Sequence, residues 1–206
     1  MALPDNKKSN YKEEIGFLSP DDLPYSPLAV SQLGGLDLQD TSKGLRYQVW
    51  TLRYDGNLKA LILEAKGKYY KVIEGVEPPV TLDLAFDQNM NYCVCYTTKD
   101  NKTILKWFNA STLTFVTDTY GNTINGHLTL DDKREEFTDT SDIIFGYIKT
   151  SNRSLNYRQQ RDRFTVEREL AINLPEELEL IKIGMTLGNR LRFQVTKQVL
   201  LPECGV

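Results

Sequence analysis

The stretch TLDLAFDQNMNYCVCYTTKDNKTILKW, residues 81–107, decides the fold class of this chain. Its apolar side chains recur at every second position in short runs, and the first two runs consist of Leu82, Leu84, Phe86, Tyr92, Val94 and Tyr96. A period of two places alternate side chains on opposite faces of a β-strand, whereas a helix needs apolar residues three and four positions apart. The pair Asp100-Asn101 is a turn signal before the next run. The stretch therefore predicts consecutive β-strands joined by hairpins.

The same pattern extends from Leu45 towards the C-terminus. Each alternating run ends at a turn signal, and these signals are Asp55-Gly56-Asn57, Lys66-Gly67-Lys68, Asp100-Asn101, Tyr120-Gly121-Asn122 and Gly188-Asn189. Short strands separated by such turns are typical of antiparallel meanders. We therefore predict an all-β domain of antiparallel meander sheets over residues 45–198, with a short tail at 199–206.

Two stretches resemble each other, one near residues 81–120 and one near 127–172. Leu84 matches Leu128, 44 positions later, and Tyr96 matches Tyr147, 51 positions later. A unit of about 40–50 residues with four strands has the size of a propeller blade. We predict a small β-propeller-like fold, with a β-sandwich as the alternative. The strands between residues 45 and 73 then either complete a C-terminal blade or leave edges that neighbouring subunits cover.

We expect the first 44 residues to form a separate, extended N-terminal arm. Pro20, Pro24, Pro27 and the pair Gly34-Gly35 argue against a regular helix or a central strand. Apolar side chains between the prolines indicate that the arm lies on a protein surface, either that of its own domain or that of a neighbouring subunit. The residues expected to anchor it in a subunit contact are Phe17, Leu18, Leu23 and Tyr25.

The composition argues against several classes of partner. The chain has 25 basic and 28 acidic residues and a net charge of −3, so it has no basic excess for direct nucleic-acid binding. Apolar runs such as Leu61–Leu63 are far shorter than the roughly 18–20 residues of a membrane-spanning helix, and no secretory signal is apparent. We expect no membrane insertion, and synthesis in a reducing cytoplasm. Cys93, Cys95 and Cys204 are then simple thiols, since the first two share one strand face.

The sequence offers no support for enzymatic chemistry. The single histidine, His127, is expected at a strand edge with local hydrogen bonds, and no nucleophile motif or phosphate-binding glycine loop accompanies it. Asp87, Asn89 and Asn91 begin like a calcium loop, but Tyr92 stands where that loop needs glycine. We expect no catalytic residue, no metal and no cofactor.

The most distinctive local feature is YRQQRDR, residues 157–163, in a connection between two strands. Arginine forms bidentate pairs with carboxylates and is enriched in protein interfaces. Arg158, Arg161 and Arg163 are therefore candidates either for hydrogen bonds between strands or blades, or for a subunit contact. Phosphate binding is the weaker alternative, because Asp162 lies within the segment.

Three segments carry a family resemblance. The segments SDIIFGY (141–147), LNYRQQRDRF (155–164) and GMTLGNRLRF (184–193) resemble a family of small virion proteins of tailed bacteriophages. Residues 84–90 and 128–133 are similar to the same family, so the resemblance spans roughly residues 80–195. It implies a structural protein associated with the tail or neck, and no enzymatic role.

Together these features predict a non-enzymatic virion component, such as a tail, collar or fibre-attachment protein. It would assemble with other phage structural proteins, as a homo-oligomer in a symmetric assembly. The alternative is a module of a tail fibre or spike that binds host-surface glycans. Its candidate stacking platforms are Trp50, Trp107, Tyr69, Tyr70 and Tyr120. A hydrolase acting on a host-surface polymer is the third and weakest hypothesis.

Overall fold

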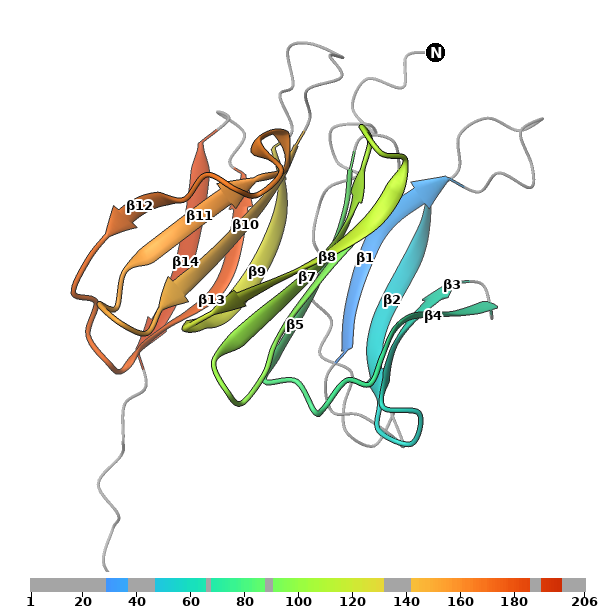
Figure 1. Cartoon of the computed structure of the whole chain (residues 1–206), viewed down its shortest axis with the longest axis horizontal. Helices are drawn as coiled ribbons and strands as arrows, with labels where there is room; N and C mark the ends of the chain where they lie inside the picture. Colours follow the sequence, from blue (N-terminus) through green and yellow to red (C-terminus); the bar gives the residue numbers. More distant parts are fainter. Residues whose placement is uncertain are drawn as a thin grey trace, which may run out of the picture.

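The structure is a computed structural model, and it describes residues 29–36, 47–65, 68–87, 91–131, 142–185 and 190–197. These residues form strands β1 to β14 in antiparallel sheets, with a single 3₁₀ turn, η2, at Gln160–Asp162 (Figure 1). The predicted all-β antiparallel fold is confirmed.

The first sheet contains β1 (Ala29–Leu36), β2 (Tyr47–Asp55), β3 (Ala60–Ala65) and β4 (Lys68–Glu74), in that order. Its first strand lies inside the segment expected to be an extended arm, so the β domain begins earlier than residue 45. The sheet also corrects the idea that the strands of residues 45–73 complete a C-terminal blade. Since β2 pairs with β1 on one side and β3 on the other, these strands form a sheet of their own.

The second and third sheets correspond to the two similar stretches of sequence. The second contains β5 (Thr81–Phe86), β6 (Tyr92–Thr97), β7 (Lys102–Asn109) and β8 (Thr114–Gly121). The third contains β9 (Thr123–Asp131), β10 (Asp142–Lys149), β11 (Leu155–Gln159) and β12 (Arg168–Ala171). Asparagine tolerates positive φ better than most residues, and it occupies such positions in the turns at Asn101 (φ 56°) and Asn122 (φ 57°).

The fourth sheet is smaller than the others. It consists of β13 (Leu178–Met185) and β14 (Leu191–Lys197), paired antiparallel. The four sheets follow one another in chain order, and their first strands lie together: β5 packs against β1, β9 against β5, and β13 against β9. The ends of the sheets that lie away from these first strands therefore form the periphery of the molecule (Figure 1).

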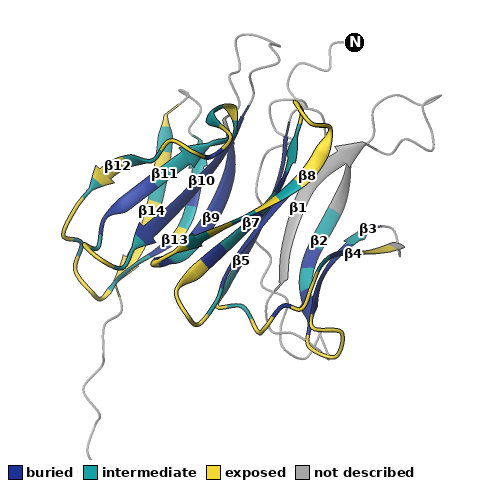
Figure 2. Ribbon diagram, viewed as in Figure 1, coloured by how far each residue is buried: buried dark blue, intermediate teal, exposed yellow. Residues whose placement is uncertain are grey.

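Three hydrophobic layers hold the sheets together, and strict alternation along the strands builds them. In β6, Val94 and Tyr96 belong to the layer shared with the first sheet, whereas Cys93 and Cys95 belong to the layer shared with the third. In β10, Phe145 faces the second sheet and Ile144 faces the fourth. The inner strands β6 and β10 of the middle sheets are therefore buried on both faces (Figure 2), which explains why these two strands are largely apolar.

Gly126 lies at a close approach between the second and third sheets. A Cβ atom at this position would lie 2.7 Å from Thr103 Cγ2 and 3.2 Å from both Phe145 Cε2 and Thr97 Oγ1. The glycine N–H also donates to Thr97 Oγ1 at 3.1 Å, so the strand cannot move away without losing this bond.

We expect Gly126→Ala to lower the free energy of unfolding by about 1–3 kcal/mol, because the added methyl group overpacks this contact. Urea denaturation followed by circular dichroism measures the change. Gly184→Ala is the matched control, since a Cβ atom on that strand glycine would meet nothing within 4 Å. Equal effects of the two substitutions would contradict the close packing at Gly126.

Candidate functional site

Arg158, a predicted contact residue, is bonded extensively within the chain. Its Nε donates to Tyr147 Oη at 2.8 Å, and its Nη2 donates to Glu167 Oε2 at 3.0 Å. Its Nη1 donates to the carbonyl oxygens of Phe164 and Thr165, both at 2.9 Å. The planar guanidinium therefore joins β10, β11 and the segment that precedes β12, a geometry that the ammonium group of lysine does not reproduce.

Glu167 is the acidic centre of the same cluster. Its carboxylate accepts hydrogen bonds from Tyr147 Oη at 2.5 Å and Lys149 Nζ at 2.6 Å. Burial raises the pKa of Glu167, but the hydrogen bonds from Lys149 and Tyr147 outweigh this effect and leave the pKa below its usual 4.5. The Arg158 guanidinium also lies 5.0 Å from the ring centroid of Tyr120 on β8, so the cluster links the third sheet to the second.

The other two predicted arginines lie in or beside the η2 turn. Arg161 binds Asp142 twice, through its backbone N–H and its Nε, both at 2.7 Å. Arg163 has a φ of 51° and is exposed, and its Nη2 reaches Ser111 Oγ at 3.3 Å across to the second sheet. Of the two interpretations of this segment, hydrogen bonding within the chain accounts for the contacts of Arg158 and Arg161. A subunit contact by any of the three stays a prediction.

The predicted anchors of the arm, Phe17, Leu18, Leu23 and Tyr25, lie outside the described residues. Their role in a subunit contact also stays a prediction.

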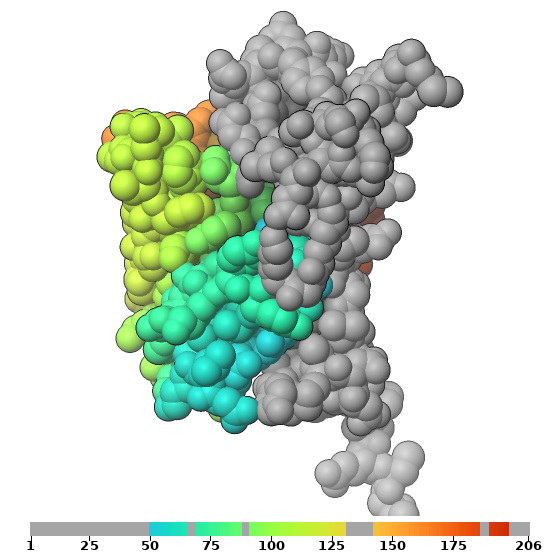
Figure 3. Space-filling view, turned by 90° about the vertical axis from the view of Figure 1, so that its right-hand side faces the viewer, coloured from blue at the N-terminus to red at the C-terminus, as the bar shows by residue number. Residues whose placement is uncertain are grey.

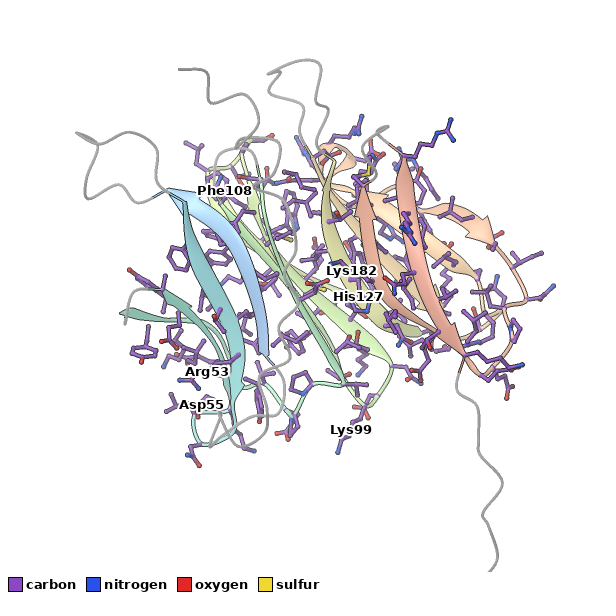
Figure 4. All side chains as sticks on the ribbon, turned by 180° about the vertical axis from the view of Figure 1, so that it is seen from behind. Arg53, Asp55, Lys99, Phe108, His127 and Lys182 are labelled. Carbon is purple, nitrogen blue, oxygen red and sulfur yellow. The ribbon has the colours of Figure 1, made fainter. Side chains whose placement is uncertain are left out.

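His127 differs from the strand-edge histidine that the sequence suggested. It lies inside β9 and is buried in the middle of the molecule (Figure 4). Its Nδ1 is 3.2 Å from Asp83 Oδ2 on β5, and its Nε2 is 3.1 Å from the carbonyl oxygen of Leu180 on β13. Both hydrogen bonds are long-range, because three strands from three different sheets meet here.

Asp83 completes this buried centre, which we call the inner-strand polar cluster (Asp83, His127 and the backbone of Leu128 and Leu180). The carboxylate is 2% exposed and accepts hydrogen bonds from the N–H groups of Leu84 at 2.8 Å and Leu128 at 2.9 Å. The aspartate and histidine resemble part of a catalytic triad, but a triad needs a ring nitrogen that faces a nucleophile. Here Nε2 faces a carbonyl oxygen, so the cluster is organised to join strands.

The calcium-like segment is arranged as a local turn. The Asp87 carboxylate accepts hydrogen bonds from the backbone N–H of Asn91 at 2.8 Å and from Asn91 Nδ2 at 3.0 and 3.2 Å. Within the described part of the chain, no group of three or more His, Cys, Asp or Glu side chains is placed to hold a metal ion. The same residues include no helix of the length and apolarity needed to cross a membrane.

Cys93 and Cys95 are buried free thiols in the layer between the second and third sheets. Burial, together with the nearby Asp87, raises the pKa of Cys93 well above its usual range. Cys95 donates from Sγ to the carbonyl oxygen of Gly126 at 3.5 Å. Both thiols therefore act as small packing groups, and Cys204 lies outside the described residues.

The five candidate aromatic platforms separate into two groups. Trp107 is buried and Tyr120 is partly buried in the layer between the second and third sheets, so neither offers a free ring face. Tyr69 and Tyr70 are exposed on β4, and Trp50 lies beside Tyr70 with the ring centroids 5.9 Å apart. Figure 3 looks onto the side of the molecule where this first sheet reaches the surface.

Most of the large exposed apolar side chains lie on or near the last strands of the sheets, a feature that the sequence pattern did not reveal, whereas Leu58, Val80 and Ile181 are exposed elsewhere. We call the residues on or near the last strands the outer-strand surface, and its members lie on β4, β8, β12 or β14 or within two residues of these strands (Figure 2). They are Tyr69, Tyr70, Leu113, Phe115, Val166, Leu170, Ile172 and Val195. Each of these strands also ends its sheet and has one edge without a partner strand among the described residues. Apolar side chains beside open strand edges are features of association surfaces.

Comparison with protein-family models found no match, and neither curated proteins nor solved structures gave one.

Proposed function

We propose that this chain is a non-enzymatic structural component of a tailed-phage virion and that it works by assembling with other protein subunits. The observation that carries the proposal is the outer-strand surface, where exposed apolar side chains lie beside strand edges that end each sheet. Such edges pair readily with another chain, and in a protein that functions alone they would be a liability.

Two further features support this function. The polar groups that would be the first candidates for chemistry, Asp83, His127 and Arg158, are engaged in bonds that hold the sheets together. The resemblance of residues 141–147, 155–164 and 184–193 to small virion proteins points to the same class of function. The partners are then other phage structural proteins, and the place of action is the virion.

Deleting residues 1–28 tests the role of the arm, because the described strands begin at Ala29. We expect the deleted protein to keep its β-sheet circular dichroism spectrum and most of its stability, yet to lose incorporation into virions by at least about tenfold. The reason is that a few buried apolar anchors dominate the energy of most interfaces. Complementation of a phage that lacks the gene, followed by quantification of the protein in purified particles, measures the effect.

The result is interpretable only if the deleted chain folds. Its unfolding midpoint in urea serves as the control, together with a full-length chain in which Asn6 and Asn10 are replaced by serine. Normal incorporation of the deleted protein would contradict the role of the arm, and absence of the full-length protein from particles would contradict the proposed function.

Glycan binding is the second candidate, because Tyr69 and Tyr70 are exposed on β4 and Tyr70 lies beside Trp50. Rings of this kind stack on sugars, but two adjacent strand residues point to opposite faces of the sheet and do not form one platform. Selective binding to a glycan array that is lost in Tyr69→Ala or Tyr70→Ala would favour this function over assembly.

A further inference from the structure

The fourth sheet has an open strand edge. Comparison with the other three sheets suggests that a further strand pairs there. The first three sheets have four strands each, whereas β13 and β14 form a sheet of two. Strand β13 packs against β9 and pairs with β14, but in the part of the chain that the structure describes nothing pairs with the other edge of β14. A two-stranded ribbon is marginally stable by itself and presents a row of unpaired N–H and C=O groups to an incoming strand.

The side chains of β14 define what kind of strand would fit beside it. Leu191 and Phe193 are half-buried on one face and continue into exposed Val195, so an added strand would cover apolar surface there. Residues 190–197 include three basic side chains and no acidic one. Two β14 strands paired with each other would therefore bring like charges together, which disfavours a symmetric contact between copies of this strand.

The N-terminal arm contains a segment that meets these requirements. Residues 5–19 form a run without proline between Pro4 and Pro20, whereas residues 20–27 contain three prolines and cannot supply a regular ladder strand. Within this run, Ile15 and Phe17 lie on either side of Gly16 and follow Glu14, and residues 13–19 carry two acidic side chains and no basic one, whereas the three lysines of the run lie at positions 7, 8 and 12. An added strand with this pattern places its apolar side chains on one face and its acidic side chain on the other, where Arg192 of β14 is exposed.

We propose that residues 5–19 of one copy of the chain add as a third strand to the open edge of β14 in a second copy. This inference rests on the proposed assembly function, and it identifies a second copy of the chain as one assembly partner. The arm leads into β1, and β14 lies on the side of β13 away from β1 (Figures 1 and 4), so the open edge faces away from the sheet where the arm ends. Such a contact joins two different surfaces, and it therefore builds a head-to-tail ring or filament.

Hydrogen exchange of the full-length chain, measured by mass spectrometry, tests the site. At high protein concentration we expect the amides of residues 190–197 to be protected, and we expect the protection to fall on dilution. Ile15→Pro removes a backbone donor from the proposed strand and should speed exchange in residues 190–197 by at least about tenfold. Asp21→Pro introduces the same residue outside the proposed strand and should leave exchange unchanged.

Cross-linking distinguishes one copy from two. A mixture of ¹⁵N-labelled and unlabelled chains is treated with a carbodiimide, which joins a carboxylate to a nearby amine. The Glu177–Lys197 pair, 3.1 Å apart, provides an internal control that should link only residues of the same label. Links from Glu13 or Glu14 to Lys197 should include mixed-label pairs, and exclusively same-label links would overturn the proposal, because the arm would then close onto its own chain.

The outcomes separate this inference from the function on which it rests. If sedimentation shows assembly that needs the arm while Ile15→Pro leaves exchange in β14 unchanged, the β14 site is wrong and the assembly function stands. If the chain sediments as a monomer at all concentrations and is absent from particles, the proposed function itself falls.

Discussion

Asp83→Ala is expected to lower the free energy of unfolding by about 3–5 kcal/mol, because it removes the shared acceptor of a buried hydrogen-bond network. The Asp83 carboxylate is 2% exposed and accepts from two backbone N–H groups, those of Leu84 and Leu128, in addition to facing His127 Nδ1. Alanine leaves these groups buried without their acceptor, and each unsatisfied donor costs about 1–3 kcal/mol. Urea denaturation measures the loss.

A double-mutant cycle with His127→Ala shows whether the inner-strand polar cluster acts as a unit. Residues in one network give non-additive effects, so the double variant should be less destabilised than the sum of the two single variants, by at least about 0.5 kcal/mol. Asp100→Ala, in an exposed turn, serves as the control and should change stability by no more than about 0.5 kcal/mol. A loss below about 1 kcal/mol for Asp83→Ala would show that the cluster does not join the sheets.

Arg158→Met is expected to lower the free energy of unfolding by about 2–5 kcal/mol. Methionine keeps much of the side-chain bulk but removes a donor from the carbonyl oxygens of Phe164 and Thr165, and it leaves Glu167 without one of its cations. Arg158→Lys should recover only part of the loss, because an ammonium group cannot reach all of these acceptors at once. Arg163→Met is the matched control from the same segment and should have an effect within about 0.5 kcal/mol, since this side chain is exposed and donates a long surface hydrogen bond of 3.3 Å to Ser111 Oγ.

The pH dependence of stability provides a second readout of this cluster. Hydrogen bonds lower the pKa of Glu167 in the folded protein below its usual 4.5, despite the opposing effect of burial. The contribution of the charged carboxylate is therefore present above about pH 4.5 and is lost as the pH falls through the lower, folded-state pKa. In Arg158→Met this acid-side loss should become smaller, because one cause of the lowered pKa is removed. An unchanged profile would show that Arg158 does not act on Glu167.

The sequence identified those parts of the fold that depend on local pattern. Strands β5 to β8 could be predicted because alternation at residues such as Leu84 and Val94 and the turn at Asp100-Asn101 are properties of neighbouring residues. Strand β1 was missed, since Gly34-Gly35 and the preceding prolines are poor strand formers. It is a strand in the structure because β2 provides its hydrogen-bond partners. Pairing between strands that are distant in sequence overrides a weak local preference.

The candidate site shows the same division. The sequence singled out Arg158 and Arg161, and it left open whether they bind within the chain or between chains. It gave no sign that His127 meets Asp83, 44 residues away, or that exposed apolar side chains gather on β4, β8, β12 and β14. The sequence by itself determined the period of two and the positions of the turns, because these depend on steric preferences within a few residues. Only the tertiary structure decided which faces are buried and which edges stay open, because those depend on how whole sheets stack.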